Sequence, residues 1–334
     1  MNKKRGQQSM VFAFPPVITS TANIVGPMEG EGILTEFYDQ IMEDNLNNKN
    51  SWELCESYMM EWAIRTAVAK DNCVMEDVDY VLAGDLLNQL MSTHFAIRNL
   101  DRPFLGLYGA CSTMVESMLI GSTLIDGGYA NKIVAAVSSH HDTAERQYRF
   151  PTEQGVQRPM ISQWTVTGAS AAVLSVIGTG PRITAATVGK IVDMGIKDPN
   201  AMGPAMAPAA ADTIWRHFSD TGRQPGYYDM IYTGDLGNVG KSLVIELFKE
   251  RGVDLSANYE DCGCMIYKKN QDAHSGASGC ASSGIVFTGY IYKMLLGKKM
   301  RKILLVGTGS LHSPTSYQQK ESIPCIAHAI AVEI

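Results

Sequence analysis

Cys111 lies where a short apolar run, Leu105 to Tyr108, gives way to a helical pattern. A thiol at the start of a helix faces unpaired backbone N–H groups and the positive end of the helix dipole, which favour an anion. The same placement lowers the pKa of a thiol and can make it a nucleophile. The alternative is a small core residue, because most free cysteines are buried and inert. The position alone leaves both interpretations open.

The helix expected after Cys111 is almost free of charge, and so is a second one after Cys280. Glu116 is the only charged residue between Phe104 and Ile125, and the second stretch has no acid or base from Gly276 to Tyr292. A helix without a polar face is expected to be surrounded by protein. Two such helices can be hidden only between two sheets. We therefore expect five layers, helix–sheet–helix–sheet–helix, with both helix N-termini facing one cleft.

The second half of the chain repeats the first. Three blocks recur in the same order: 81–89 matches 231–239, 109–119 matches 278–288, and 127–139 matches 297–309. Matched blocks in one order indicate a duplication. Each copy alternates strands with helices, which is typical of a parallel-rich α/β unit. We expect an N-terminal half over 1–178, carrying Cys111, and a C-terminal half over 179–334, carrying the loop of His274.

Local patterns predict the elements around these blocks. Strands are expected at 10–18, 78–83, 132–137 and 171–177, and helices at 33–42 and 52–70. The polar segment 141–167 is expected to be irregular and to cover a pocket.

Composition limits the classes of function. The chain has 334 residues, a net charge of −6 and seven cysteines without regular spacing. The acidic balance argues against nucleic acid as a partner, and the odd cysteine count indicates a reducing compartment. Pro15 and Pro16 interrupt the apolar N-terminus, so we expect no signal peptide and no transmembrane helix. Cys262, Cys264 and Cys280 with His274 lack zinc-site spacing, so no metal site is predicted.

Four motifs together resemble the thiolase and ketoacyl synthase superfamily. They are GACSTM at 109–114, TGASAAV at 167–173, HSGASG at 274–279 and VGTGS at 306–310. The resemblance covers nearly the whole chain. It implies two duplicated α/β halves in a five-layer α-β-α-β-α sandwich, a nucleophilic Cys111 and a homodimer.

One catalytic position of that superfamily differs here. A histidine usually follows the middle strand of the second half, whereas this chain has Gly234 and Asp235. An aspartate repels an enolate instead of stabilising it. His274 stands near the second catalytic position, in a loop one residue shorter than in thiolases. We therefore expect a protein that binds a ligand without catalysis. The alternatives are an acyl-transferring enzyme that uses Cys111 with His274, and a structural subunit with a vestigial pocket.

The sequence of the segments 103–121, 138–155 and 233–243 resembles a sporulation branch of the superfamily, found in endospore-forming bacteria. That resemblance implies binding of dipicolinic acid (pyridine-2,6-dicarboxylate), with or without calcium and with no other cofactor. It also implies that the protein helps to move this acid across the spore inner membrane. The protein would lie at the periphery of that membrane and work with other stage V sporulation membrane subunits.

A planar dianion needs donors for two carboxylates. The elbow at Cys111 and Ser112 can hold one through backbone N–H groups. An arginine fork suits the other, and Arg146, Arg149 and Arg158 are the candidates. The remaining candidate ligand contacts are side chains that donate hydrogen bonds or end a strand near the cleft: His140, His141, His274, Ser275 and Thr308. The repeated Gly-Asp-Leu turns at Asp85 and Asp235 are expected to fix strand ends and the dimer seam.

Overall fold

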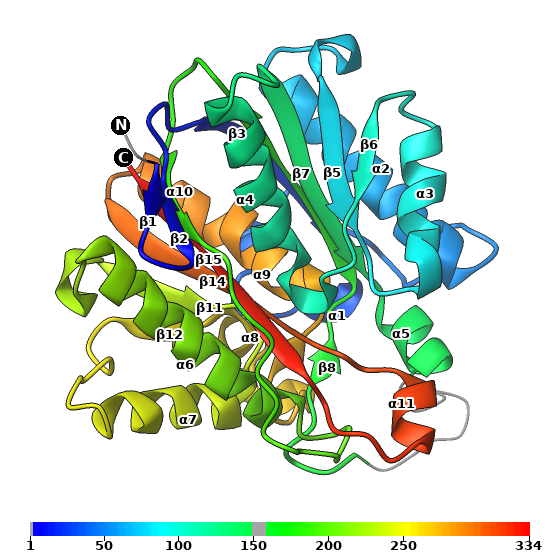
Figure 1. The fold of residues 1–334 in the computed structure, drawn as a ribbon. Coiled ribbons are helices and arrows are strands. Elements are labelled where there is room, and N and C mark those ends of the chain that lie inside the picture. The colour runs from blue at the N-terminus through cyan, green and yellow to red at the C-terminus, as the bar shows by residue number, and fades with distance from the viewer. Residues whose placement is uncertain (1–2, 149–157) are drawn as a thin grey trace.

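The structure, a computed structural model, describes residues 3–148 and 158–334 (Figure 1). Its main strands form one path that divides into two halves, joined where Arg182 of one half pairs with Val17 of the other. The first half has the order β3-β9-β7-β5-β6. Its strands are β3 (Val17–Val25), β9 (Gly168–Ser175), β7 (Lys132–Ser139), β5 (Tyr80–Gly84) and β6 (Phe104–Gly106).

The second half has the matching order β10-β15-β14-β11-β12. These strands are β10 (Arg182–Thr187), β15 (Cys325–Glu333), β14 (Lys302–Ser310), β11 (Met230–Thr233) and β12 (Tyr259–Asp261). In each half the second strand of the order is antiparallel to both neighbours, and the following pairs are parallel. The predicted duplication is therefore confirmed by the topology.

Helices make up the other three layers, as Figure 1 shows. Helices α2 (Trp52–Lys70) and α3 (Met91–Arg98) cover the outer side of the first half, and α6 (Met202–Thr221) and α7 (Gly237–Lys249) cover that of the second. Between the sheets lie α4 (Thr113–Asp126) and α9 (Cys280–Val286), which a π-helical turn and α10 (Tyr292–Leu296) continue. The predicted five-layer sandwich is confirmed.

The remaining elements are short. They are β1 (Lys4–Arg5), β2 (Ser9–Val11), α1 (Pro27–Gly30), β4 (Gln40–Ile41), α5 (His141–Tyr148), β8 (Trp164–Thr165), α8 (Cys262–Met265), β13 (Ala277–Ser278) and α11 (Pro314–Gln318). The predicted boundary at 178/179 falls in the connection between β9 and β10 and stays a prediction.

Three local predictions were wrong. The strand expected over 10–18 is two strands, β2 and β3, because Pro15 and Pro16 between them lack the N–H that a ladder needs. The segment 33–42 holds a 3-10 turn at Thr35–Phe37 and then β4 in place of a helix. The segment 141–167 begins with a helix, α5, and includes β8. By contrast, α2 matches its predicted bounds, and the hydroxyl of Ser51 caps it by accepting from the Leu54 N–H.

Close packing of the central helices can be tested at Gly284 of α9. A Cβ added there would lie 2.2 Å from Ser170 Oγ and 2.9 Å from Val137 Cγ2. We expect Gly284→Ala to lower the free energy of unfolding by roughly 1–3 kcal/mol, although alanine is intrinsically the better helix former. Urea unfolding measures the change. Gly226→Ala is the control, because a Cβ there meets nothing within 4 Å; equal stability of both variants would contradict the tight packing.

Candidate functional site

A strained turn presents Cys111. Ala110, Cys111 and Ser112 form a 3-10 turn between β6 and α4, and Ala110 has φ +51°. A left-handed conformation costs an alanine about 1–2 kcal/mol, and neighbouring bonds hold it. Thr113 Oγ1 donates to the Ala110 carbonyl at 2.6 Å. Gly309 of β14 approaches so closely that a Cβ would lie 2.6 Å from the Gly109 oxygen. The turn is thus clamped between the two halves.

The Cys111 sulfur faces a carboxyl group from the other half of the chain. Its thiol donates a hydrogen bond to Asp235, which follows β11. Thr308 Oγ1 donates to Asp235 Oδ1 at 2.7 Å, and the Gly279 N–H donates to Oδ2 at 3.0 Å. Burial, the Asp235 charge and Cys280 raise the pKa of the Cys111 thiol well above its usual range. Of the two interpretations left open for Cys111, this direction favours the buried thiol, because desolvation and a nearby anion outweigh the helix end.

The repeat also brings the charge of an aspartate to bear on a second cysteine, without a hydrogen bond between the two. Cys280, the counterpart of Cys111, begins α9 and donates from Sγ to the Ala110 carbonyl at 3.0 Å. Burial is the largest cause that raises the pKa of Cys280, and the charge of Asp85, the counterpart of Asp235, raises it further. Each half therefore places a carboxyl group near the cysteine of the other half.

Asp235 was expected to fix a strand end, and the structure gives it another role, beside the thiol. Asp85 has the predicted structural role, because its carboxylate accepts the N–H groups of Leu87 and Thr93, both at 2.7 Å. In the second half Asp261 does this instead, accepting from Leu236 and Gly237, each at 2.9 Å. Asp235 is left to face the thiol, and burial raises its pKa to about 7. The sequence signal for a role at the site was that Asp235 stands at a position where the superfamily usually has histidine.

A cavity of about 780 Å³ opens beside Cys111. We call it the thiol cavity. Its described lining includes the elbow, Ser278, Gly279 and residues 309–315, and it contains no lysine or arginine. Glu116 adds a carboxyl group whose pKa is raised by burial. His328 of β15 lines it too, and burial lowers the pKa of His328 to about 4, so this ring is neutral at pH 7. The thiol cavity therefore offers no fixed cation.

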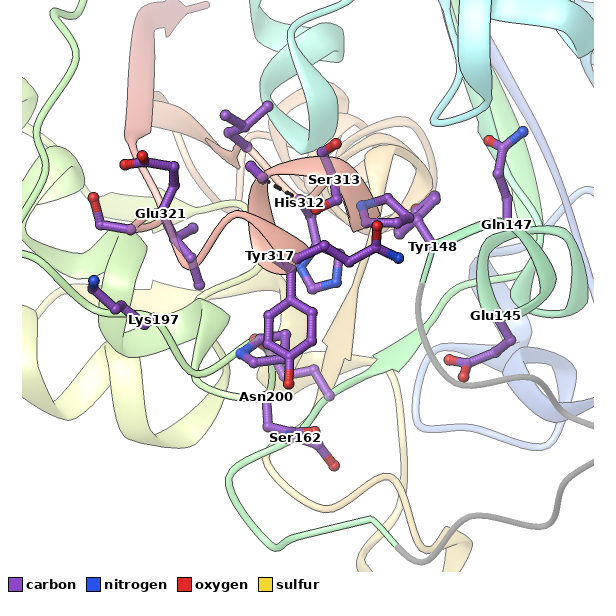
Figure 2. Close-up of a pocket in the computed structure, with 18 of the residues that line it drawn as sticks. Glu145, Gln147, Tyr148, Ser162, Lys197, Asn200, His312, Ser313, Tyr317 and Glu321 are labelled. Carbon is purple, nitrogen blue, oxygen red and sulfur yellow. Dashed lines mark hydrogen bonds between the residues drawn. The ribbon is translucent and has the colours of Figure 1, made fainter.

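A second cavity of about 370 Å³ adjoins the first. We call it the arginine cavity because Arg146, Arg158 and Lys197 line it. The two cavities share Gln147, Tyr148 and residues 311–314. In Figure 2, Lys197 and Glu321 lie at one side of the arginine cavity and Glu145 and Gln147 at the other, with His312 and Tyr317 between. Together the cavities form one continuous candidate site.

Arg158 is held firmly at the wall of the arginine cavity. Its guanidinium lies 4.6 Å from the ring centre of Trp164 and 3.2 Å from Glu145 Oε1. Its side chain is 17% exposed. Arg146 pairs with Glu53 and lies over Trp52. Stacking on an aromatic ring fixes the plane of a guanidinium and orients its donors.

Most of the predicted ligand contacts lie away from both cavities. His274 occupies a turn with φ +52°, and its Nδ1 lies 3.1 Å from Ser162 Oγ. Ser275 Oγ accepts the Val239 N–H at 3.4 Å, and Ser112 Oγ donates to the Gly109 carbonyl at 2.7 Å. Thr308 donates a hydrogen bond to the Asp235 carboxylate, as described above. None of these four lines either cavity in the described chain.

The histidines after β7 are packed into the structure. His140 is buried, with Nε2 2.7 Å from the Asn45 carbonyl oxygen. The His141 ring stacks on Trp164 with centroids 3.8 Å apart. Neither lines a cavity, and Arg149 lies outside the described residues. Of the predicted ligand residues, Cys111, Arg146 and Arg158 reach the described lining of the cavities, and all the ligand roles stay predictions.

Residues 3–148 and 158–334 contain neither a metal-binding cluster nor a membrane-spanning helix. No group of three or more His, Cys, Asp or Glu side chains is arranged to hold a metal ion. No helix in these ranges is long and apolar enough to cross a membrane.

The effect of Asp235 on the thiol can be tested with Asp235→Asn. Removing the charge should lower the pKa of Cys111 by about one unit and raise its alkylation by iodoacetamide about tenfold. The rates are compared at about pH 8, because Asp235, with a pKa of about 7, is then largely ionised in the parent protein. Peptide mass mapping assigns the labelled cysteine. Cys55, a buried cysteine whose pKa is raised by burial and by Glu56 and not by Asp235, is the control; an unchanged rate at Cys111 would contradict the contact.

Comparison with known proteins gives two kinds of match. The family described as Stage V sporulation protein AD (SpoVAD) matches residues 6–333. Stage V sporulation protein AD of Bacillus subtilis (strain 168) is 45% identical over 331 residues, covering 99% of this chain and 98% of the relative.

The solved structures are more distant in sequence. 3-oxoacyl-[acyl-carrier-protein] synthase III from Aquifex aeolicus VF5 has a TM-score of 0.59 at 12% identity, covering 96% of this chain and 100% of its own. A variant of Xanthomonas campestris OleA bound with cerulenin has a TM-score of 0.63 at 15% identity, covering 97% and 98%. At these identities the likeness establishes the fold alone.

Proposed function

The chain belongs to the stage V sporulation protein AD family, and on this premise we propose that it binds dipicolinic acid without catalysing a reaction on it. It serves the uptake or release of that acid at the spore inner membrane, together with other stage V sporulation membrane subunits. Family membership supports the sporulation role. Co-purification with those subunits from spore membranes tests the partnership, and a chain that never accompanies them would contradict it.

The proposal that the protein does not catalyse a reaction rests on the contact between Cys111 and Asp235. A condensing enzyme needs a thiolate and groups that stabilise an enolate oxygen. Here the thiol pKa is raised, and a carboxyl group occupies the position next to it. His312 and His328 line the thiol cavity, but the largest causes that shift the pKa of the Cys111 thiol are burial and then Asp235, both of which raise it. This arrangement favours binding over acyl transfer.

The charges of the two cavities favour one orientation of the ligand. Dipicolinate is a planar dianion, and a guanidinium fork matches a carboxylate. The thiol cavity has Glu116 and no lysine or arginine in its described lining, whereas Arg146 and Arg158 line the arginine cavity. The carboxylates therefore lie toward these arginines. The ring packs near Tyr148 and His312, whose own rings are 5.5 Å apart on the shared wall.

Acyl transfer by Cys111 is the second candidate, favoured by the open cavity beside the thiol. The alkylation experiment separates the two functions. A parent Cys111 that is alkylated much faster than the buried Cys55 at pH 7 would be an activated thiol and would favour the enzyme.

Direct binding can be measured by titration calorimetry with dipicolinate, with and without calcium. We expect saturable binding to the parent chain, weakened about tenfold to a hundredfold by Arg158→Ala, because hydrogen bonds to a charged group are worth about 1.5–3 kcal/mol. Arg251→Ala is the matched control, since Arg251 also stacks on a tryptophan, Trp215, at 5.0 Å. A parent chain that binds no dipicolinate under either condition would contradict the proposal.

The edge of the first sheet supports a homodimer. Strand β6 pairs only with β5 in the described chain, and Leu105 on it is 45% exposed. Phe95 and Tyr108 beside it are also exposed. An unpaired apolar edge is a site for pairing with a twin strand across a two-fold axis.

Light scattering after size-exclusion chromatography tests this dimer. The parent protein should have twice the mass of one chain, and Leu105→Arg should shift it toward the monomer because a buried unpaired charge is unfavourable at an interface. Leu296→Arg, at a residue that is 46% exposed on α10, should leave the mass unchanged. A monomeric parent protein would end the proposal.

A further inference from the structure

A cysteine and a lysine meet far from the two cavities. Cys73 follows the end of α2, and Lys132 is the first residue of β7. Lys132 Nζ lies 2.5 Å from Cys73 Sγ, which is closer than an ordinary hydrogen bond. The same nitrogen lies 2.5 Å from Asp71 Oδ2, and Cys73 Sγ lies 3.2 Å from that oxygen. The three groups therefore form a compact cluster at the base of α2.

We propose that Cys73 and Lys132 are a redox-sensitive pair that a peroxide joins by a covalent sulfur–nitrogen bond. The contact places the amine nitrogen where it can attack the sulfur with little movement. No such bond is needed for the ligand site, so this modification is independent of the proposed function.

The surroundings of Cys73 suit oxidation. Of the seven cysteines, Cys73 and Cys264 are only partly buried, and the other five are buried. Peroxides oxidise cysteine sulfurs that solvent can reach, and Lys132 donates a hydrogen bond to this one. The Lys132 and Asp71 side chains are 17% and 11% exposed, so the cluster lies close to solvent. Asp71 orients the ammonium group by its ion pair.

The chemistry balances in two steps. Hydrogen peroxide transfers one oxygen atom to the Cys73 sulfur, giving a sulfenic acid and water; the sulfur is oxidised by two electrons and the peroxide is reduced by two. The Lys132 ammonium group releases one proton to solvent, and its nitrogen then attacks that sulfur. The S–N bond forms, the S–O bond breaks, and the hydroxyl leaves as water with the second proton of the amine. The product is a sulfenamide, which a thiol reductant converts back to cysteine and lysine.

The cross-link would fasten the outer helix to the sheet. It would join positions 59 residues apart in sequence, connecting the end of α2 to the start of β7. A covalent link of this kind restricts the unfolded chain, as a disulfide does. Oxidised protein should therefore melt at a higher temperature than reduced protein.

Peptide mass spectrometry of the full chain after treatment with hydrogen peroxide tests the proposal. We expect a peptide pair joined through Cys73 and Lys132, lighter than the separate peptides by two hydrogen atoms, and no tryptic cleavage after Lys132. Dithiothreitol should restore both peptides. Cys264 is the internal control, because it too is only partly buried, and among the described residues the lysine bonded to a cysteine sulfur is Lys132, at Cys73.

Two variants separate the link from simple oxidation. Cys73→Ser should abolish the joined peptides and the rise in melting temperature. Lys132→Arg keeps the positive charge and should leave Cys73 to proceed to sulfinic acid. A parent protein in which Cys73 is oxidised without joining Lys132, or is not oxidised at all, would overturn the proposal.

Discussion

The fold depends on the burial of two apolar helices between two sheets. Helices α4 and α9 have almost no polar face, so each must be covered on every side. Covering them both at once brings their N-termini to the same end of the molecule. The elbow of Cys111 and the turn at Gly279 then meet, and the loop after β11 closes over them. The position of the thiol is thus a result of core packing.

That packing also decides the chemistry of the thiol. In water, the end of a helix would favour a thiolate. Inside this core, desolvation penalises the charged form, and the buried Asp235 adds a repulsive charge. The carboxyl group itself reaches a pKa of about 7, because Thr308, Gly279 and Cys111 stabilise its charge less than burial penalises it. The scaffold of a condensing enzyme therefore surrounds a sulfur that stays protonated, and the cations lie in the adjoining arginine cavity.

The sequence predicted the architecture better than the site. The repeat and the two apolar helices were sufficient to predict the five layers. The local pattern of 52–70 was sufficient to predict the bounds of α2. The role of Asp235 depends on which carboxyl group accepts the N–H groups at the start of α7, and Asp261 takes that place only in the folded chain. His274 could not be placed either, because its positive φ turns the side chain toward Ser162. Spacing along the chain does not determine such directions.

The exchanged thiol–carboxyl neighbours carry an evolutionary consequence. After a duplication, two copies are usually free to diverge, yet here Asp85 lies near the cysteine of one copy and Asp235 near that of the other. A copy expressed by itself would keep an acid and lose the sulfur that the acid faces. Mutations in one copy are therefore limited by the groups of the other copy. We expect the ancestor to have been a dimer of two identical chains that already exchanged these groups across the symmetry axis.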